Sequence, residues 1–115
     1  MLGTGFPYDH KQYADAYTTV LTAVLKRVQG VRRMGAAVLD LAWVAAGRFD
    51  GFWELGLAPW DLAAGLLLIR EAGGTVTTPD GEPSTPFHPL LVASNPHVHD
   101  DLRDIVQRNV PGHLA

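Results

Sequence analysis

Residues 53–74 read WELGLAPWDLAAGLLLIREAGG and contain the most apolar helical run of the chain. Pro59 suits the first turn of a helix, where its missing N–H costs no hydrogen bond. The two glycines that close the stretch are typical of a helix end. We therefore predict a helix from Pro59 to about Ala72, with Asp61 in its first turn.

An acidic side chain at the start of this helix has two interpretations. The Asp61 carboxylate can accept hydrogen bonds from unpaired backbone N–H groups and face the positive end of the helix dipole. The same position can also hold Mg²⁺ against a phosphate bound at the helix N-terminus. One carboxylate does not complete a Mg²⁺ site, and no second acid stands at a convincing ligand spacing. The residues alone favour the structural interpretation.

The pattern around this helix predicts one mixed α/β domain covering residues 1–115, with helices packed on a sheet. Asp9 is a candidate N-cap for the first helix, and residues 30–34 are interpreted as a short basic link. Strands are predicted at residues 1–6, 75–79 and 88–95, and residues 48–56 are predicted to form a turn followed by a strand. Helices are predicted at 10–29, 35–47, 59–72 and 95–109. A chain that opens within a strand resembles the back half of a larger domain.

Composition excludes several classes of protein. The net charge of -3 and a pI near 5.9 argue against a nucleic-acid partner. The basic residues that cluster in the sequence, interpreted as a solvated helix end, are Lys26, Arg27, Arg32 and Arg33. The absence of cysteine excludes disulfides and thiolate sites. No signal peptide or bilayer-spanning run is visible, so we expect a soluble, cytoplasmic protein with no membrane partner.

The remaining acidic residues have mainly structural interpretations. Glu54 should lie on the strand face opposite Trp53 and Leu55, where a solvated carboxylate is ordinary. Its position just before the Asp61 helix allows an alternative, in which it accepts a hydrogen bond from a hydroxyl-bearing ligand. Asp40 and Asp50 are predicted to be structural hydrogen-bond acceptors.

The histidines and serines give weak signals. His97 and His99 form an H-x-H pair, which supplies too few ligands for Zn²⁺ and is interpreted as surface. Ser84 and Ser94 do not stand in a nucleophile-elbow motif, which excludes a serine hydrolase of that type.

Several stretches together resemble the inositol monophosphatase family in its bacterial inositol-1-monophosphatase form. The W-D-x-A-x-G helix start followed by E-A-G-G is similar to that family's C-terminal signature. The matching stretches are TGFPYD at 4–9, residues 32–65, REAGG at 70–74 and LVASNP at 91–96. The resemblance covers essentially the whole chain, as the family's C-terminal half. It implies a layered αβαβα sandwich, usually a homodimer, that acts as a Mg²⁺-dependent phosphomonoesterase on inositol monophosphate or a similar small ester.

The resemblance also implies roles for particular residues. Asp61 matches an acid that binds metal near the reacting oxygen of the substrate, and its helix is expected to be buried between layers. Glu54 matches an acid that contacts a sugar-alcohol hydroxyl. Gly35, Ala36 and Ala37 match a backbone segment that lines the substrate pocket. The family more often has Ser or Thr at position 36, so a side-chain hydrogen bond is lost here.

Two metal-binding motifs of the family, G-E-E and D-P-x-D-G-T, do not occur in these 115 residues. We therefore expect the chain alone to have little or no phosphatase activity. Apolar faces on the helices at 10–29 and 36–47 should be uncovered, which favours a homo-oligomer or completion by the missing N-terminal half. The alternatives are a non-catalytic remnant acting by binding or dimerisation, and a related phosphatase for histidinol phosphate, a phosphoadenosine nucleotide or fructose bisphosphate. Glu54 in its W-E-L-G setting favours an inositol-like polyol.

Overall fold

The computed structural model of the chain describes residues 1–6, 10–56, 59–88 and 90–110, apart from the side chains of His10 and Asp61. Asp9, the predicted N-cap of the first helix, lies outside the described residues. In chain order the elements are β1 (Leu2–Thr4), α1 (His10–Leu25), β2 (Val31–Arg33), α2 (Ala37–Ala45), β3 (Gly51–Leu55), α3 (Pro59–Glu71), β4 (Thr75–Thr77), β5 (Leu90–Ser94) and α4 (His99–Asn109). The four predicted helices and four predicted strands are confirmed, with shorter bounds.

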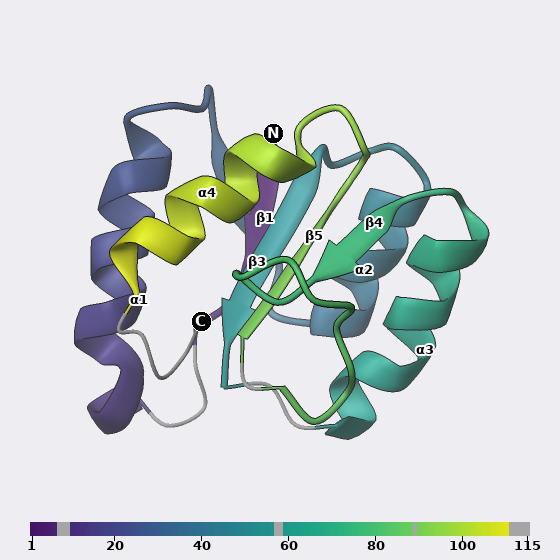
Figure 1. The fold of residues 1–115 in the computed structure, drawn as a ribbon, viewed down its shortest axis with the longest axis horizontal. Helices are drawn as coiled ribbons and strands as arrows, with labels where there is room; N and C mark the ends of the chain where they lie inside the picture. Colours follow the sequence, from purple (N-terminus) through teal and green to yellow (C-terminus); the bar gives the residue numbers. More distant parts are fainter. Residues whose placement is uncertain (7–9, 57–58, 89, 111–115) are drawn as a thin grey trace.

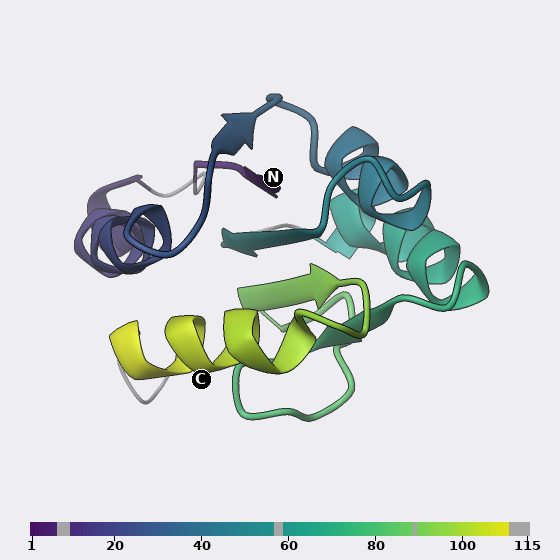
Figure 2. The same cartoon turned by 90° about the horizontal axis from the view of Figure 1, so that it is seen from above.

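The five strands form one mixed sheet in the order β2-β1-β3-β5-β4. β1 pairs in parallel with both β2 and β3, whereas β5 is antiparallel to both β3 and β4. Helices α1 and α4 cover one face of the sheet and α2 and α3 cover the other (Figures 1 and 2). The described chain is therefore a three-layer α/β/α arrangement.

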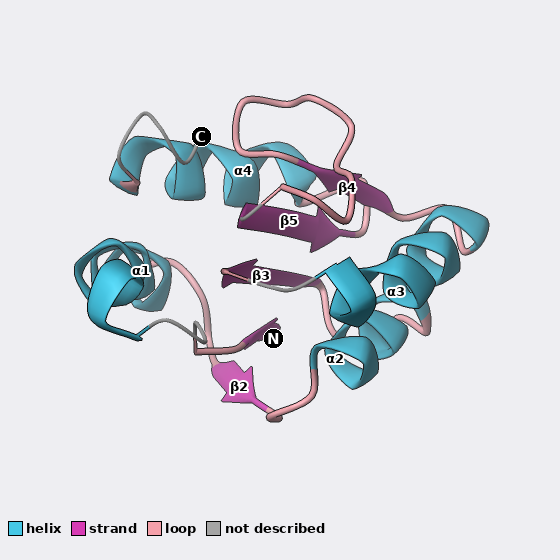
Figure 3. Ribbon diagram, turned by 90° about the horizontal axis from the view of Figure 1, so that it is seen from below, coloured by secondary structure: helices cyan, strands magenta, loops and turns pink. Residues whose placement is uncertain are grey.

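The strand β2 corrects the prediction of a basic link at residues 30–34. Val31 pairs with Leu2, and Arg33 pairs with Thr4, at the open edge of the sheet (Figure 3). Two of its three residues are exposed arginines, so no apolar alternation marks it in the sequence. Charged side chains on an edge strand also discourage pairing with another chain.

The central strand β3 contributes to both hydrophobic cores. Phe52 packs with α2 and α3, and Trp53 packs with α1 and α4. Helices on both faces leave no solvent-exposed side on this strand. The prediction of a solvated Glu54 is therefore wrong, because its side chain is only 6% exposed.

The layer formed by α2 and α3 is apolar on its outer side as well. Leu62, Leu66 and Ile69 of α3 are buried against the sheet and α2. Leu67 is nevertheless 60% exposed and Leu68 45% exposed, so α3 is covered on one side only in this chain. The expected burial of α3 between two layers is thus not met by the described residues.

The helix α2 shows the uncovered apolar residues that the sequence predicts. Val38 and Leu39 are 43% and 39% exposed. On α1, Leu25 is the exposed large apolar residue in the described part of the chain. The outer surface of the α2 and α3 layer is therefore the main uncovered apolar face.

The last helix begins four residues later than the sequence suggests. The Asn95 side-chain oxygen accepts hydrogen bonds from the N–H groups of His97 and Val98, at 2.9 and 3.2 Å. This side-chain-capped turn covers residues 95–98, and the regular hydrogen bonding of α4 begins after it, at His99. Among the described residues, no helix has the length and apolar character needed to cross a membrane.

Candidate functional site

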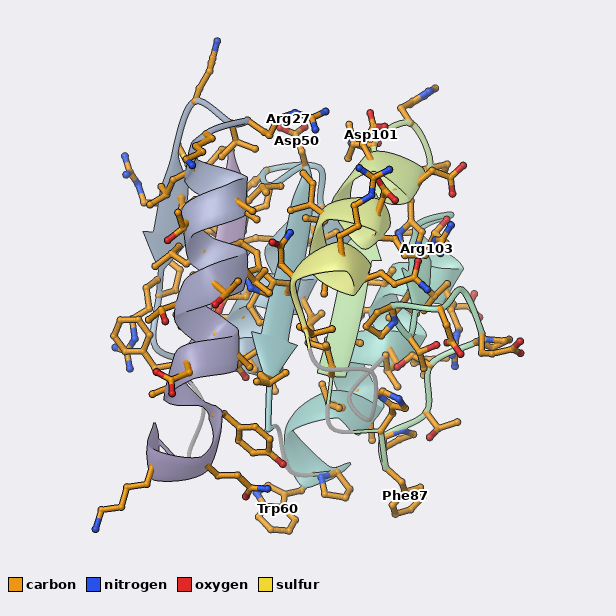
Figure 4. All side chains as sticks on the ribbon, turned by 60° about the vertical axis from the view of Figure 1, so that its left-hand side comes forward. Arg27, Asp50, Trp60, Phe87, Asp101 and Arg103 are labelled. Carbon is orange, nitrogen blue, oxygen red and sulfur yellow. The ribbon has the colours of Figure 1, made fainter. Side chains whose placement is uncertain are left out.

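The candidate site lies where the carboxyl ends of the parallel strands meet the starts of two helices. β1, β2 and β3 run in the same direction, so their carboxyl-terminal ends lie together at one end of the strands, called here the carboxyl edge of the sheet. The chain enters α2 and α3 from that edge, which also carries Trp60 (Figure 4). In open α/β sheets, ligands bind preferentially at this edge.

Glu54 is buried near this end of the sheet. Its carboxylate lies against the backbone of Gly5, so closely that a side-chain carbon at position 5 would overlap it. Gly5 therefore has a packing reason to lack a side chain. The sequence did not single out Gly5, although a glycine directly after a strand is a recognised sign of close backbone approach.

The turn before α2 combines a left-handed glycine with a helix start that has no side-chain cap. Gly35 has φ +86°, in the left-handed region that glycine adopts most readily. Ala36 is the N-cap residue, with extended backbone and no side-chain hydrogen bond to the helix. The first N–H groups of α2, beginning at Ala37, have no intrahelical acceptor, and a helix start of this kind attracts an anion.

Asp61 belongs to the first turn of α3. Its side chain lies outside the part of the chain that the structure describes. Its predicted metal-binding role therefore stays a prediction. The exposed fraction of the neighbouring Trp60 is 80%, and Trp60 stands at the opening of the same helix.

A buried pair of hydroxyl groups connects α1 to the strands β1 and β3. The Thr4 hydroxyl lies 3.0 Å from the Tyr17 hydroxyl and donates to the Trp53 carbonyl at 3.1 Å. Burial raises the pKa of Tyr17, and the negative charge of Glu54 raises it further. The Tyr17 ring stacks on Trp53, with 6.3 Å between centroids. These hydrogen bonds and the ring stacking join α1, β1 and β3 next to the candidate site.

Asp40 is a buried acid close to the site, and its hydrogen bonding differs from the prediction. Its side chain is 1% exposed, and its Oδ1 atom has no hydrogen-bond partner among the described residues. The prediction of a structural acceptor is therefore wrong at Oδ1. Burial raises the pKa of Asp40 to about 6, against the opposing charge of Arg33. Its carboxylate can thus take up a proton near neutral pH.

Arg33 lies near the site, although the sequence favours its interpretation as part of a solvated helix end. Its guanidinium lies over the Phe6 ring, 4.8 Å from the centroid. It also lies next to Gly35 and acts electrostatically on Asp40. Arg33 is the last residue of β2, and a basic residue at the end of a strand would have indicated a possible site residue. The sequence did not predict β2, so this indication was lost.

The other singled-out residues lie elsewhere. Asp50 accepts a hydrogen bond from the Met1 ammonium group at 2.9 Å, as expected of a structural acceptor. His97 is exposed, as predicted. The surface interpretation is wrong for His99, which is 5% exposed because the first turn of α4 packs on β4 and β5. Its ring nitrogens lie 2.8 Å from the Ser94 hydroxyl and 2.9 Å from the Thr77 hydroxyl.

The described acids do not assemble a magnesium site by themselves. Within residues 1–6, 10–56, 59–88 and 90–110, no group of three or more His, Cys, Asp or Glu side chains is placed to hold a metal ion. Mg²⁺ requires near-octahedral oxygen ligation. The described donor set therefore does not fit this ion without further ligands.

Comparison with known proteins relates the whole of this arrangement to one family. Residues 1–110 match the model of the inositol monophosphatase family. The chain is 50% identical over 111 residues to the inositol-1-monophosphatase of Rhizobium meliloti (strain 1021), which covers 96% of the chain and 42% of that protein. It is 46% identical over 116 residues to the Nus factor SuhB of Escherichia coli (strain K12). This alignment covers 94% of the chain and 43% of that protein.

The solved structures agree with these sequence matches. The inositol monophosphatase from Anabaena (Nostoc) sp. PCC 7120 superposes with a TM-score of 0.88 at 41% identity, over 99% of this chain and 45% of that one. The chain thus spans less than half of the relatives it matches. The predicted α/β fold class and the predicted resemblance to the inositol monophosphatase family are confirmed.

Proposed function

Because the chain belongs to the inositol monophosphatase family, we propose that it forms part of a Mg²⁺-dependent phosphatase for inositol monophosphate or a similar small phosphate ester. The observation that carries this proposal is the placement of Glu54. A carboxylate buried against Gly5, at the edge where α2 and α3 begin, is suited to accept a hydrogen bond from a substrate hydroxyl.

Three parts of the chain have distinct roles in the proposal. The turn Gly35–Ala37 offers backbone N–H groups of α2 to the anionic or hydroxyl-bearing side of the substrate. Glu54 orients the alcohol portion by accepting a hydroxyl hydrogen bond. Asp61, in the first turn of α3, is the acid assigned to the metal ion. A bound Mg²⁺ would supply charge neutralisation at the phosphate and activation of a water.

The test compares the chain alone with a completed protein. The completed form joins the chain to the remaining portion of the Rhizobium meliloti relative, and phosphate release from myo-inositol 1-phosphate is measured with and without Mg²⁺. We expect no release by the chain alone and Mg²⁺-dependent release by the completed protein. Asp61→Asn should abolish that release. Glu54→Gln should lower kcat/KM at least about tenfold, because one charged hydrogen bond is worth roughly 1.5–3 kcal/mol.

A matched control is Glu71→Gln, at the exposed far end of α3. Its activity in the completed protein should equal that of the unsubstituted form. Mg²⁺-dependent release by the 115-residue chain alone, lost in Asp61→Asn, would contradict the expected inactivity. Unchanged activity of Glu54→Gln in the completed protein would remove the assigned role of Glu54.

The second candidate function is action through association. It is favoured by the uncovered apolar residues Val38, Leu39, Leu67 and Leu68, which form the outer surface of the α2 and α3 layer. Similarity to proteins named Nus factor SuhB also allows a role other than catalysis. Mg²⁺-dependent phosphate release by the completed protein favours the phosphatase, whereas association without such release favours this candidate.

A further inference from the structure

A groove of about 510 Å³ runs along the outer seam between α1 and α4. These two helices lie side by side on one face of the sheet (Figure 1). Residues of both helices, and the two that follow α1, form its walls: Thr19, Thr22, Ala23, Lys26, Arg27, Asp104, Ile105, Arg108 and Asn109. The groove therefore joins segments that are far apart in the sequence.

The charges around this groove are unbalanced. Lys26 and Arg27 follow the last residue of α1, and Arg108 comes from the last turn of α4. Asp104 is the acid in the lining, and its Oδ1 accepts a hydrogen bond from Arg108 Nε at 3.1 Å. Lys26 and Arg27 have no ion-pair partner in the described part of the chain. The lining thus has a surplus of two positive charges, on a chain whose net charge is -3.

Helix capping accounts for part of this arrangement. A cation near a helix C-terminus is stabilised by the helix dipole, which suits Arg108 in α4 and Lys26 after α1. The dipole does not require cations of two helices to face one hollow. The hydroxyl of Thr19, which also lines the groove, donates to the Asp15 carbonyl at 2.8 Å and is thus used within α1.

We propose that this groove binds a small phosphate-bearing anion, either inorganic phosphate or a phosphate monoester. A phosphate monoester carries a charge of about -1.5 to -2 at neutral pH, which balances the surplus of the lining. Arginine offers several N–H donors to phosphate oxygens and lysine offers a point charge. The volume falls within the range of small-molecule sites.

The groove is separate from the candidate site. Arg27 lies at the end of the molecule opposite Trp60 (Figure 4). The main uncovered apolar surface belongs to α2 and α3, on the other face of the sheet.

The proposal can be tested by NMR titration of the ¹⁵N-labelled chain at low salt with inorganic phosphate and with phenyl phosphate, a phosphate monoester. We expect saturable shifts confined to residues 19–27 and 104–109. The double variant Lys26→Gln/Arg27→Gln and the single variant Arg108→Gln should each raise Kd by about tenfold or more, since close charge pairs dominate such binding. Added salt should weaken binding in the unsubstituted chain.

The matched control is Lys11→Gln, an exposed lysine near the other end of α1, which should leave Kd unchanged. Circular dichroism verifies that each variant is folded; if the double variant is unfolded, Arg108→Gln decides. Shifts absent from the groove, or equally weakened by Lys11→Gln, overturn the proposal. A 12-nucleotide oligouridine that binds the groove more than tenfold tighter than phenyl phosphate also overturns it, in favour of a nucleic-acid partner.

Discussion

At the scale of single residues, Asp40 links structure to pH. Its pKa of about 6 lies above its ordinary value, so the folded state binds this proton more tightly than the unfolded chain. The stability from this proton is fully present below about pH 4 and is lost as pH rises through about 6. The loss is at most on the order of 3 kcal/mol, because one pKa unit corresponds to about 1.4 kcal/mol.

Asp40→Asn should therefore gain stability relative to the unsubstituted chain as pH rises from 5 to 7.5. Urea unfolding at several pH values measures the difference between the two curves. Asp15→Asn, an exposed acid on α1, serves as the control and should give a constant difference. A constant difference for Asp40→Asn as well would show that burial does not perturb this carboxyl.

Gly5 provides a second prediction at this scale. In Gly5→Ala the new methyl group would occupy the space of the Glu54 carboxylate, and that buried side chain would have to move. We expect a loss of roughly 1–3 kcal/mol in the free energy of unfolding, as for other overpacked sites. Gly30→Ala, which meets only the flexible Met1 side chain, should lose much less in the same urea measurement. Equal losses would count against the close packing of Glu54.

The sequence identifies candidate acids but says little about their surroundings. Glu54 was singled out as a site candidate, but its burial could not be inferred from alternation alone. The reason is physical: β3 has strands on both sides and helices on both faces, and that depends on contacts with distant residues. The unpaired Oδ1 of Asp40 depends likewise on how α2 packs over β1.

At the scale of elements, His99 holds α4 to β4 and β5 through two hydroxyl contacts. Its nitrogens face Thr77 of β4 and Ser94 of β5. Burial lowers the pKa of His99, Asp100 opposes that shift and Arg103 adds to it. Because the folded state favours the neutral ring, the stability from this group is present above the unfolded pKa near 6.5 and is lost as pH falls below it.

Acidification from pH 7.5 to 5 should therefore destabilise the unsubstituted chain more than His99→Gln. Thermal melts of both proteins at each pH give the comparison, with the exposed His97→Gln as the matched control. His99→Gln should melt lower at pH 7.5, because Gln replaces two buried contacts imperfectly. If His97→Gln alters the pH profile and His99→Gln does not, the assignment to His99 is wrong.

The helices were easier to predict than the strands. The alternation of small and large residues at 35–47 suggested close packing, and a side-chain carbon at Gly65 of α3 would indeed overlap Leu41 of α2. The strand β2 was missed because two of its three side chains are exposed and charged. Short edge strands give little sequence signal, since neighbouring strands rather than apolar residues define them.

At the scale of the whole molecule, the uncovered α2 and α3 surface predicts self-association of the isolated chain. Leu67 and Leu68 are exposed on α3, and Val38 and Leu39 are exposed on α2, the helix that packs against it. Exposed apolar patches of this kind favour contact with another chain. Sedimentation velocity should show species larger than one chain, and Leu67→Glu/Leu68→Glu should shift them toward the monomer.

Leu25→Glu is the control, because Leu25 is similarly exposed but lies on α1. It should leave the association unchanged. A monomeric unsubstituted chain with a cooperative melt would contradict the prediction. Association that responds to Leu25→Glu and not to the α3 variant would move the interface to the other face of the sheet.

The mixed strand directions have a consequence for the order in which the sheet forms. The pairing of β1 with β3 brings together Thr4 and Trp53, which are 49 residues apart in the chain. Closing this long loop costs more chain entropy than closing a short one. β4 and β5 are neighbours in the sequence and pair antiparallel, so closing their loop costs less chain entropy. Contacts close in sequence form faster than distant ones. Pulsed hydrogen exchange during refolding should therefore find the amides of β4 and β5 protected before those of β1, with the parallel half of the sheet completed last.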